Sequence, residues 1–184
     1  MTVPPSETEL IAAVFARIAA QGWRRLRLQP GERRVFGGRA GLLLAFGRLA
    51  DAAALATDNP SEDDDVHDRL LDVLMARIEF LQTHRPGVLA LLEGVRFDPA
   101  AAALLAAASL GSMGKLLEAA GLGSTGARGG LRRKGLLAVW LWTVRAWRQD
   151  TSDDLATTMA ALDRALRHAE RLGKLLQVCA PAES

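Results

Sequence analysis

The stretch GWRRLRLQPGERRVFGGRAGLLLAF, residues 22–46, decides how the N-terminal part of the chain is organised. Apolar residues recur at helical spacing on both sides of it, over residues 6–20 and 39–56. Within the stretch, Pro30-Gly31 and Gly37-Gly38 are turn signals. We therefore expect two helices here, joined by a short basic segment in which the helical pattern is broken.

The composition favours an all-α fold. Apolar residues make up 49% of the 184-residue chain and tyrosine is absent, while the dominant alanine and leucine are strong helix formers. The single cysteine, Cys179, cannot form an internal disulfide and fits a reducing cytoplasm. The first ten residues lack signal-peptide features, and no apolar run approaches the ~18–20 residues that span a bilayer. The sequence predicts a cytoplasmic bundle of about eight helices without strands.

Local signals place the ends of several helices. Ser6 and Glu9 have the spacing of a capping box at the start of the first helix. Asp98, followed by Pro99, marks the start of another, and Ser152 is expected to cap the last one. The remaining predicted helices cover residues 66–82, 86–95 and 131–149.

Charge is segregated along the chain. Residues 1–50 carry eight arginines against three acidic residues, whereas residues 51–99 carry eleven acidic residues against four arginines. A basic end can hold a polyanion or pair with an acidic neighbour, and charge alone leaves both open. If the chain binds DNA, the expected phosphate contacts are Arg24, Arg25, Arg27, Arg33, Arg34 and Arg39.

The residues give little support to catalysis. The histidines His67, His84 and His168 are far apart, and none has metal-ligand spacing. We interpret His84 as a histidine at a helix C-terminus rather than as a ligand contact. The acidic run at 62–65 precedes a helix, where acidic residues are common. We expect no catalytic residue, metal or cofactor, and hence a protein that is not an enzyme.

The order of elements in the N-terminal part is more informative than any single residue. A capped helix ends in AAQGW, the basic segment RRLRL follows, and Phe36, Arg39 and residues 42–44 open the next helix. This order resembles the DNA-binding end of TetR-type transcription regulators. The resemblance implies a helix-turn-helix, an all-α ligand-binding domain, and a homodimer in which the two final helices pair with their copies.

The space for a helix-turn-helix is short. Seven residues, 29–35, separate Leu28 from Phe36, and seven residues form at most about two turns of helix. A recognition helix reads base edges in the major groove, and we expect it to be eroded here, with weak and salt-sensitive DNA binding at most. The predicted domains are a remnant DNA-binding-type region, 1–56, and a helical ligand-binding and dimerisation domain, 66–178.

A second pattern surrounds the tryptophan-rich helix near the C-terminus. It consists of Lys134, Gln149, Asp150, Ser152, Asp154, Thr158, Leu162, Asp163 and Leu166. These positions resemble the closing segment of the Coq-nine proteins, TetR-fold lipid-binding accessory proteins of ubiquinone biosynthesis. This resemblance implies a lipid or quinone ligand and peripheral contact with a membrane.

Three functional hypotheses follow. The first is a TetR-like homodimer with an apolar small-molecule pocket and impaired or lost sequence-specific DNA binding. The second is a Coq-nine-like lipid-binding accessory protein, and the third is a helical dimerisation module without a ligand. Arg145 either anchors a ligand in the pocket or reaches solvent. The expected pocket residues are Leu74, Ile78, Leu105, Met113, Trp140, Val144 and Arg145, and the expected dimer contacts are Leu136, Trp142, Leu155, Met159, Leu162 and Leu166.

Overall fold

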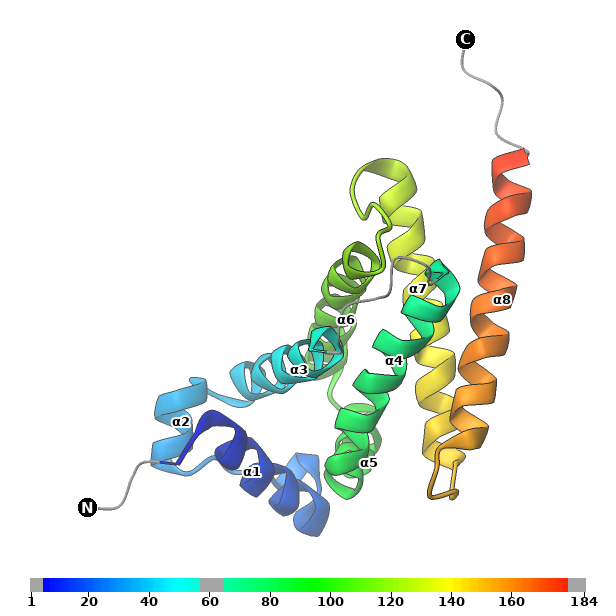
Figure 1. The fold of residues 1–184 in the computed structure, drawn as a ribbon. Helices are drawn as coiled ribbons and strands as arrows, with labels where there is room; N and C mark the ends of the chain where they lie inside the picture. Colours follow the sequence, from blue (N-terminus) through cyan, green and yellow to red (C-terminus); the bar gives the residue numbers. More distant parts are fainter. Residues whose placement is uncertain (1–4, 57–64, 179–184) are drawn as a thin grey trace. The chain divides into compact units, whose positions relative to one another are not determined.

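The computed structural model describes residues 5–56 and 65–178, and these ranges contain eight α-helices, one 3-10 turn and no strand (Figure 1). The prediction of an all-α fold of about eight helices is therefore confirmed. In chain order the elements are α1 (Glu7–Gln21), η1 (Trp23–Arg25), α2 (Pro30–Phe36), α3 (Arg39–Leu55), α4 (Val66–Thr83), α5 (Arg85–Val95), α6 (Pro99–Ala119), α7 (Gly126–Gln149) and α8 (Ala156–Val178).

The predicted capping signals at the starts of α1 and α6 are confirmed. The backbone N–H of Ser6 donates to Glu9 Oε2 at 2.7 Å, and the N–H of Glu9 donates to Ser6 Oγ at 3.2 Å. At α6, the N–H of Ala101 donates to Asp98 Oδ1 at 3.1 Å. Each cap satisfies an N–H group that has no partner inside its helix.

The expectation that Gln29-Pro30-Gly31 breaks the helical pattern was wrong. These residues begin α2 instead, because proline fits the first position of a helix, where its missing N–H is not needed. The N–H of Gln29 donates to Glu32 Oε2 at 2.8 Å, which completes a cap, and Gly37, at a φ of 71°, ends the helix. A seven-residue helix thus lies between α1 and α3.

The chain forms two compact units. Unit 1 contains residues 1–56 and 76–112, and unit 2 contains residues 57–75 and 113–184. The sequence-based division shares the boundary at residue 56, but the structure adds residues 76–112 to the first unit. The physical reason is packing: these residues supply aromatic rings to the core of unit 1, and α5 packs along α1 there.

The core of unit 1 is built around stacked aromatic rings. Phe15 and Phe46 stack with their centroids 4.1 Å apart, and Phe80 lies 5.2 Å from Phe46. Gly87 allows α5 to approach α1 closely, since a Cβ atom at this position would lie 2.4 Å from the carbonyl oxygen of Phe15. A side chain at residue 87 would therefore push the two helices apart.

In unit 2, α7 and α8 run side by side (Figure 1). Both helices bury large apolar residues, including Trp147 and Leu162, which have no exposed surface. The turn between the two helices contains Leu155, which adopts a φ of 56° although it is not glycine. Such a backbone conformation is uncommon and persists when surrounding contacts hold it in place.

One helix is more apolar than was expected from the sequence. The 21-residue helix α6 has a mean hydropathy of 1.5 over an 18-residue window, which is enough, by length and composition only, to cross a membrane. The expectation that no apolar segment reaches this length is therefore corrected. One such helix is weak evidence for a membrane span, because core helices of soluble proteins satisfy the same criterion.

Candidate functional site

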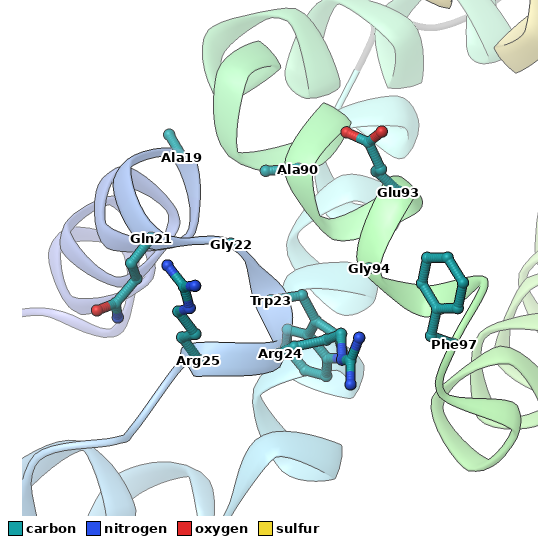
Figure 2. Close-up of a pocket in the computed structure, with 10 residues that line it drawn as sticks. All are labelled: Ala19, Gln21, Gly22, Trp23, Arg24, Arg25, Ala90, Glu93, Gly94 and Phe97. Carbon is teal, nitrogen blue, oxygen red and sulfur yellow. The ribbon is translucent and has the colours of Figure 1, made fainter.

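Unit 1 contains a cleft of about 720 Å³ between the end of α1 with η1 and the end of α5 (Figure 2). Gln21 and Arg25 lie on one side of this cleft, while Glu93 and Phe97 lie on the other. The complete lining comprises Ala19, Gln21, Gly22, Trp23, Arg24, Arg25, Ala90, Glu93, Gly94 and Phe97.

Trp23, which is almost fully buried, forms the floor of the cleft. The helix α1 ends at Gly22, whose φ of 81° turns the chain into η1. The indole N–H of Trp23 then donates to Asp98 Oδ2 at 3.0 Å. Gly94 allows the close packing, because a Cβ atom there would lie 2.6 Å from Trp23 Cβ.

Arg39, one of the six arginines expected to contact phosphate, instead contacts Trp23 and Asp98 within unit 1. Its guanidinium lies 3.9 Å from the centre of the Trp23 ring and donates to the Trp23 carbonyl at 3.0 Å. It also lies 3.5 Å from Asp98 Oδ2. The N–H of Ala101, the Trp23 indole and Arg39 together hold the pKa of the Asp98 carboxyl below its usual value. Arg39 therefore stabilises the cleft floor.

The other five predicted arginines are exposed, and two of them line the cleft. The Arg24 guanidinium lies 5.7 Å from the centre of the Phe97 ring, and that of Arg96 lies 5.9 Å from it. Phe97 is 66% exposed. Neither Phe97 nor Arg96 was predicted from the sequence, although a large aromatic residue between an arginine and the helix cap Asp98 is a signal. The exposed arginines are Arg24, Arg25, Arg27, Arg33 and Arg34.

The predicted pocket residues belong to both units. Ile78 and Leu105 lie in unit 1, whereas the other five lie in unit 2. Leu74, Ile78 and Met113 have no surface that solvent reaches. Trp140 is buried, Leu105 and Val144 are half-buried, and Arg145 is exposed on α7.

The predicted dimer contacts divide into two groups. Trp142 and Met159 are exposed, at 59% and 45%. Leu136, Leu155, Leu162 and Leu166 are buried within the chain itself. Leu131 and Leu141, which the sequence analysis did not include, are exposed at 57% and 59% on α7. Leu172 of α8 is also exposed, at 55%, so both α7 and α8 carry exposed apolar side chains.

Three of the residues that resemble the Coq-nine pattern, Asp150, Ser152 and Thr158, form a hydrogen-bonded cap at the start of α8. The prediction that Ser152 caps this helix was wrong, because α8 begins at Ala156. Asp150 does so instead: its carboxylate accepts from the N–H and the hydroxyl of Ser152 and from the N–H and the hydroxyl of Thr158. Burial alone would raise the pKa of Asp150, but these bonds outweigh it and hold the pKa far below its usual value.

Two of the three histidines make specific contacts. His84 lies against the rings of Phe15, Phe46 and Phe80, and burial lowers its pKa. His67 bridges Asp163 and Glu170, with ring nitrogens 3.0 Å and 2.6 Å from the carboxylate oxygens. His168 is exposed. Among the residues that the structure describes, no three histidine, cysteine or acidic side chains are grouped to hold a metal ion.

A buried polar cluster in unit 1 was not predicted. Arg77 Nη1 lies 2.6 Å from Asp51 Oδ1, and the Ser112 hydroxyl donates to Asp51 Oδ2 at 2.9 Å. All three residues are only 5% exposed. A buried ion pair of this kind links α3, α4 and α6, since separating its charges leaves each of them buried without its counter-charge.

No protein-family model matches the chain, and no curated protein is similar enough in sequence to indicate a relationship. The site must therefore be interpreted from its own chemistry. The cleft combines an open aromatic ring, exposed guanidinium groups and one carboxylate, Glu93. Such a surface can bind anions and stack planar groups.

Proposed function

We propose that the protein is a homodimeric binding protein of the TetR-regulator type without sequence-specific DNA recognition. The short length of α2 is the observation that supports the loss of sequence-specific DNA binding. Its seven residues extend only about 10 Å. Its exposed cations, Arg33 and Arg34, suit phosphate contacts, which position a protein without reading sequence.

The test of this part is a binding assay with duplex DNA. Duplexes of unrelated sequence are expected to bind equally weakly, and raising the salt from about 50 to 200 mM is expected to abolish binding. Tight, sequence-specific binding to one duplex at about 150 mM salt would refute the loss of base recognition.

The exposed side of α7 supports the homodimer. Leu131, Ala138 and Trp142 follow each other at intervals of seven and four residues, so they lie on one side of the helix. All three are exposed, and Leu141 borders them. Burying a large apolar side chain contributes about 2 kcal/mol to the free energy of association. In a two-fold dimer each of these side chains is buried once in each protomer, so its contribution counts twice.

Light scattering of the full chain at micromolar concentration tests the homodimer. The wild type is expected to be a dimer, and Trp142→Glu to be a monomer, because a charge would enter the interface. Leu55→Glu is the matched control, since Leu55 is an exposed leucine of α3 in unit 1 and is 44% exposed. A monomeric wild type, or a Trp142→Glu variant that stays dimeric, contradicts the proposal.

A lipid-binding accessory function is the second candidate, and α6 favours it. Only 33% of its most apolar 18-residue window is buried. Its exposed positions are mostly alanine, and such an apolar surface suits contact with a lipid or a membrane. Native mass spectrometry of protein purified from a membrane-containing extract tests the idea: a co-purified lipid supports it, and a protein without lipid contradicts it.

A further inference from the structure

We propose that the cleft of unit 1 binds single-stranded nucleic acid, with an unstacked base on Phe97 and the neighbouring phosphates on Arg24 and Arg25. This inference concerns a different nucleic-acid form from the duplex considered above. It rests on the exposed ring, on the charge of the segment beside it, and on the size of the cleft.

Phe97 has the exposure of a stacking surface. The ring is 66% exposed at the rim of a cleft of about 720 Å³. The guanidinium groups of Arg24 and Arg96 lie 5.7 Å and 5.9 Å from its centre, whereas that of Arg39 lies 3.9 Å from the centre of the Trp23 ring. Both Arg24 and Arg96 therefore lie within cation–π range of the Phe97 ring, and a base that stacks on this ring would displace one of them. Aromatic rings of this kind accept any base, because every base has a π-face.

The segment beside the cleft carries five exposed arginines. Residues 22–39 contain six arginines and one acidic residue, Glu32, and the sixth arginine, Arg39, lies 3.5 Å from Asp98 Oδ2. Glu32 is buried and paired with Arg17 at 2.5 Å, so it does not offset the exposed arginines. The same segment of sequence also contains the exposed Arg27, Arg33 and Arg34, and several cations suit a strand with several phosphates better than a single small anion.

The cleft also offers groups that can contact a base edge. Gln21 and Glu93 lie on opposite sides of it, and an amide and a carboxylate are both partners for the donors and acceptors of bases (Figure 2). The remaining walls are small, with Ala19 and Ala90 facing the cleft, and leave room for a planar group.

The same features favour a single strand over a duplex or a membrane. Bases in a duplex are already stacked on one another, so they cannot lie on Phe97 without being flipped out. A membrane-bound surface inserts a broad apolar face, whereas Phe97 is one ring beside alanine and glycine and is surrounded by exposed arginines.

Fluorescence anisotropy of the full chain with a labelled thymidine oligonucleotide of about 12 nucleotides tests the proposal. The single strand is expected to bind more tightly than a duplex of the same length. Phe97→Ala is expected to weaken single-strand binding by about tenfold, while Phe97→Trp retains it. Val35→Ala is the matched control, because Val35 is an exposed apolar residue, 53% exposed, outside the cleft lining. It is expected to leave the affinity unchanged.

The charge contribution is tested with the salt dependence of the same assay. Replacing both Arg24 and Arg25 with alanine is expected to reduce the slope of log affinity against log salt by about 1.4. Arg171→Ala, an exposed arginine of α8, is expected to leave the slope unchanged. The Phe97 and arginine variants change exposed residues, and circular dichroism verifies that they remain folded.

Three results would overturn the inference. They are equal or tighter binding of the duplex, an unchanged single-strand affinity in Phe97→Ala, or Phe97-dependent binding to anionic phosphatidylserine vesicles without binding to the oligonucleotide. None of these results bears on the dimer or on the loss of base recognition, so the failure of this inference and of the proposed function can be told apart.

Discussion

The ion pair between Asp51 and Arg77 gives the sharpest prediction about stability. Both side chains are almost fully buried, at 7% and 6% exposure, with 2.6 Å between the paired atoms. Replacing Asp51 with alanine leaves the guanidinium buried without its carboxylate and also removes the acceptor of the Ser112 hydroxyl. Removing one partner of a buried pair costs about 3–5 kcal/mol. We therefore expect Asp51→Ala to lower the free energy of unfolding by about 4 kcal/mol.

The protein contains a natural control for this prediction. Arg48 and Glu7 form a pair of the same chemistry, 3.0 Å apart, but their side chains are 61% and 43% exposed. An exposed pair contributes about 0–1 kcal/mol, so Glu7→Ala is expected to have little effect.

Urea denaturation followed by circular dichroism measures both changes at the same pH and salt. The double variant Asp51→Leu with Arg77→Met removes both charges and is expected to recover most of the loss, because no charge is then left buried alone. If Asp51→Ala costs no more than Glu7→Ala, or if the double variant is less stable than Asp51→Ala, the argument from burial is refuted.

Three further changes test the packing, the capping and the ionisation of the chain. Burial lowers the pKa of His84, so the unfolded chain binds a proton more readily than the folded chain does. The free energy of unfolding should therefore fall as the pH drops from about 6.5 to 5. His84→Phe should remove this loss of stability in a urea titration at several pH values. Asp150→Ala removes four hydrogen bonds at the start of α8 and should cost about 3 kcal/mol, whereas alanine at the exposed Asp153 should cost almost nothing in the same denaturation assay. Gly87→Ala should lower the melting temperature, because the new Cβ would meet the Phe15 carbonyl, while Gly47→Ala in the open middle of α3 should raise it or leave it unchanged.

Much of the helical architecture could be predicted from residues that are close in sequence. Ser6 and Glu9 are three residues apart, as are Asp98 and Ala101, and in both cases the cap is a local hydrogen bond. The helix α2 was missed although its signal was equally local. Gln29 and Glu32 form its cap, and Pro30 was interpreted as a break when it occupies the first turn.

The candidate site depends on residues that are distant in sequence. Arg24 and Phe97 are separated by more than seventy positions and meet only because Gly94 lets the end of α5 pack against Trp23. The exposure of Phe97 could not be predicted from the sequence either, since an aromatic residue beside a helix cap is buried or exposed depending on what packs over it.

Local sequence signals establish the helical class, the positions of most helix ends and the basic character of the N-terminal segment, because propensity, capping and charge act over a few residues. Tertiary structure alone decided that residues 76–112 join the first unit, that Asp51 meets Arg77, and that Arg39 supports Trp23 while Arg24 remains exposed. The physical reason is that burial depends on which surfaces pack together, and a periodic apolar pattern shows that a helix has a buried face without showing what covers it.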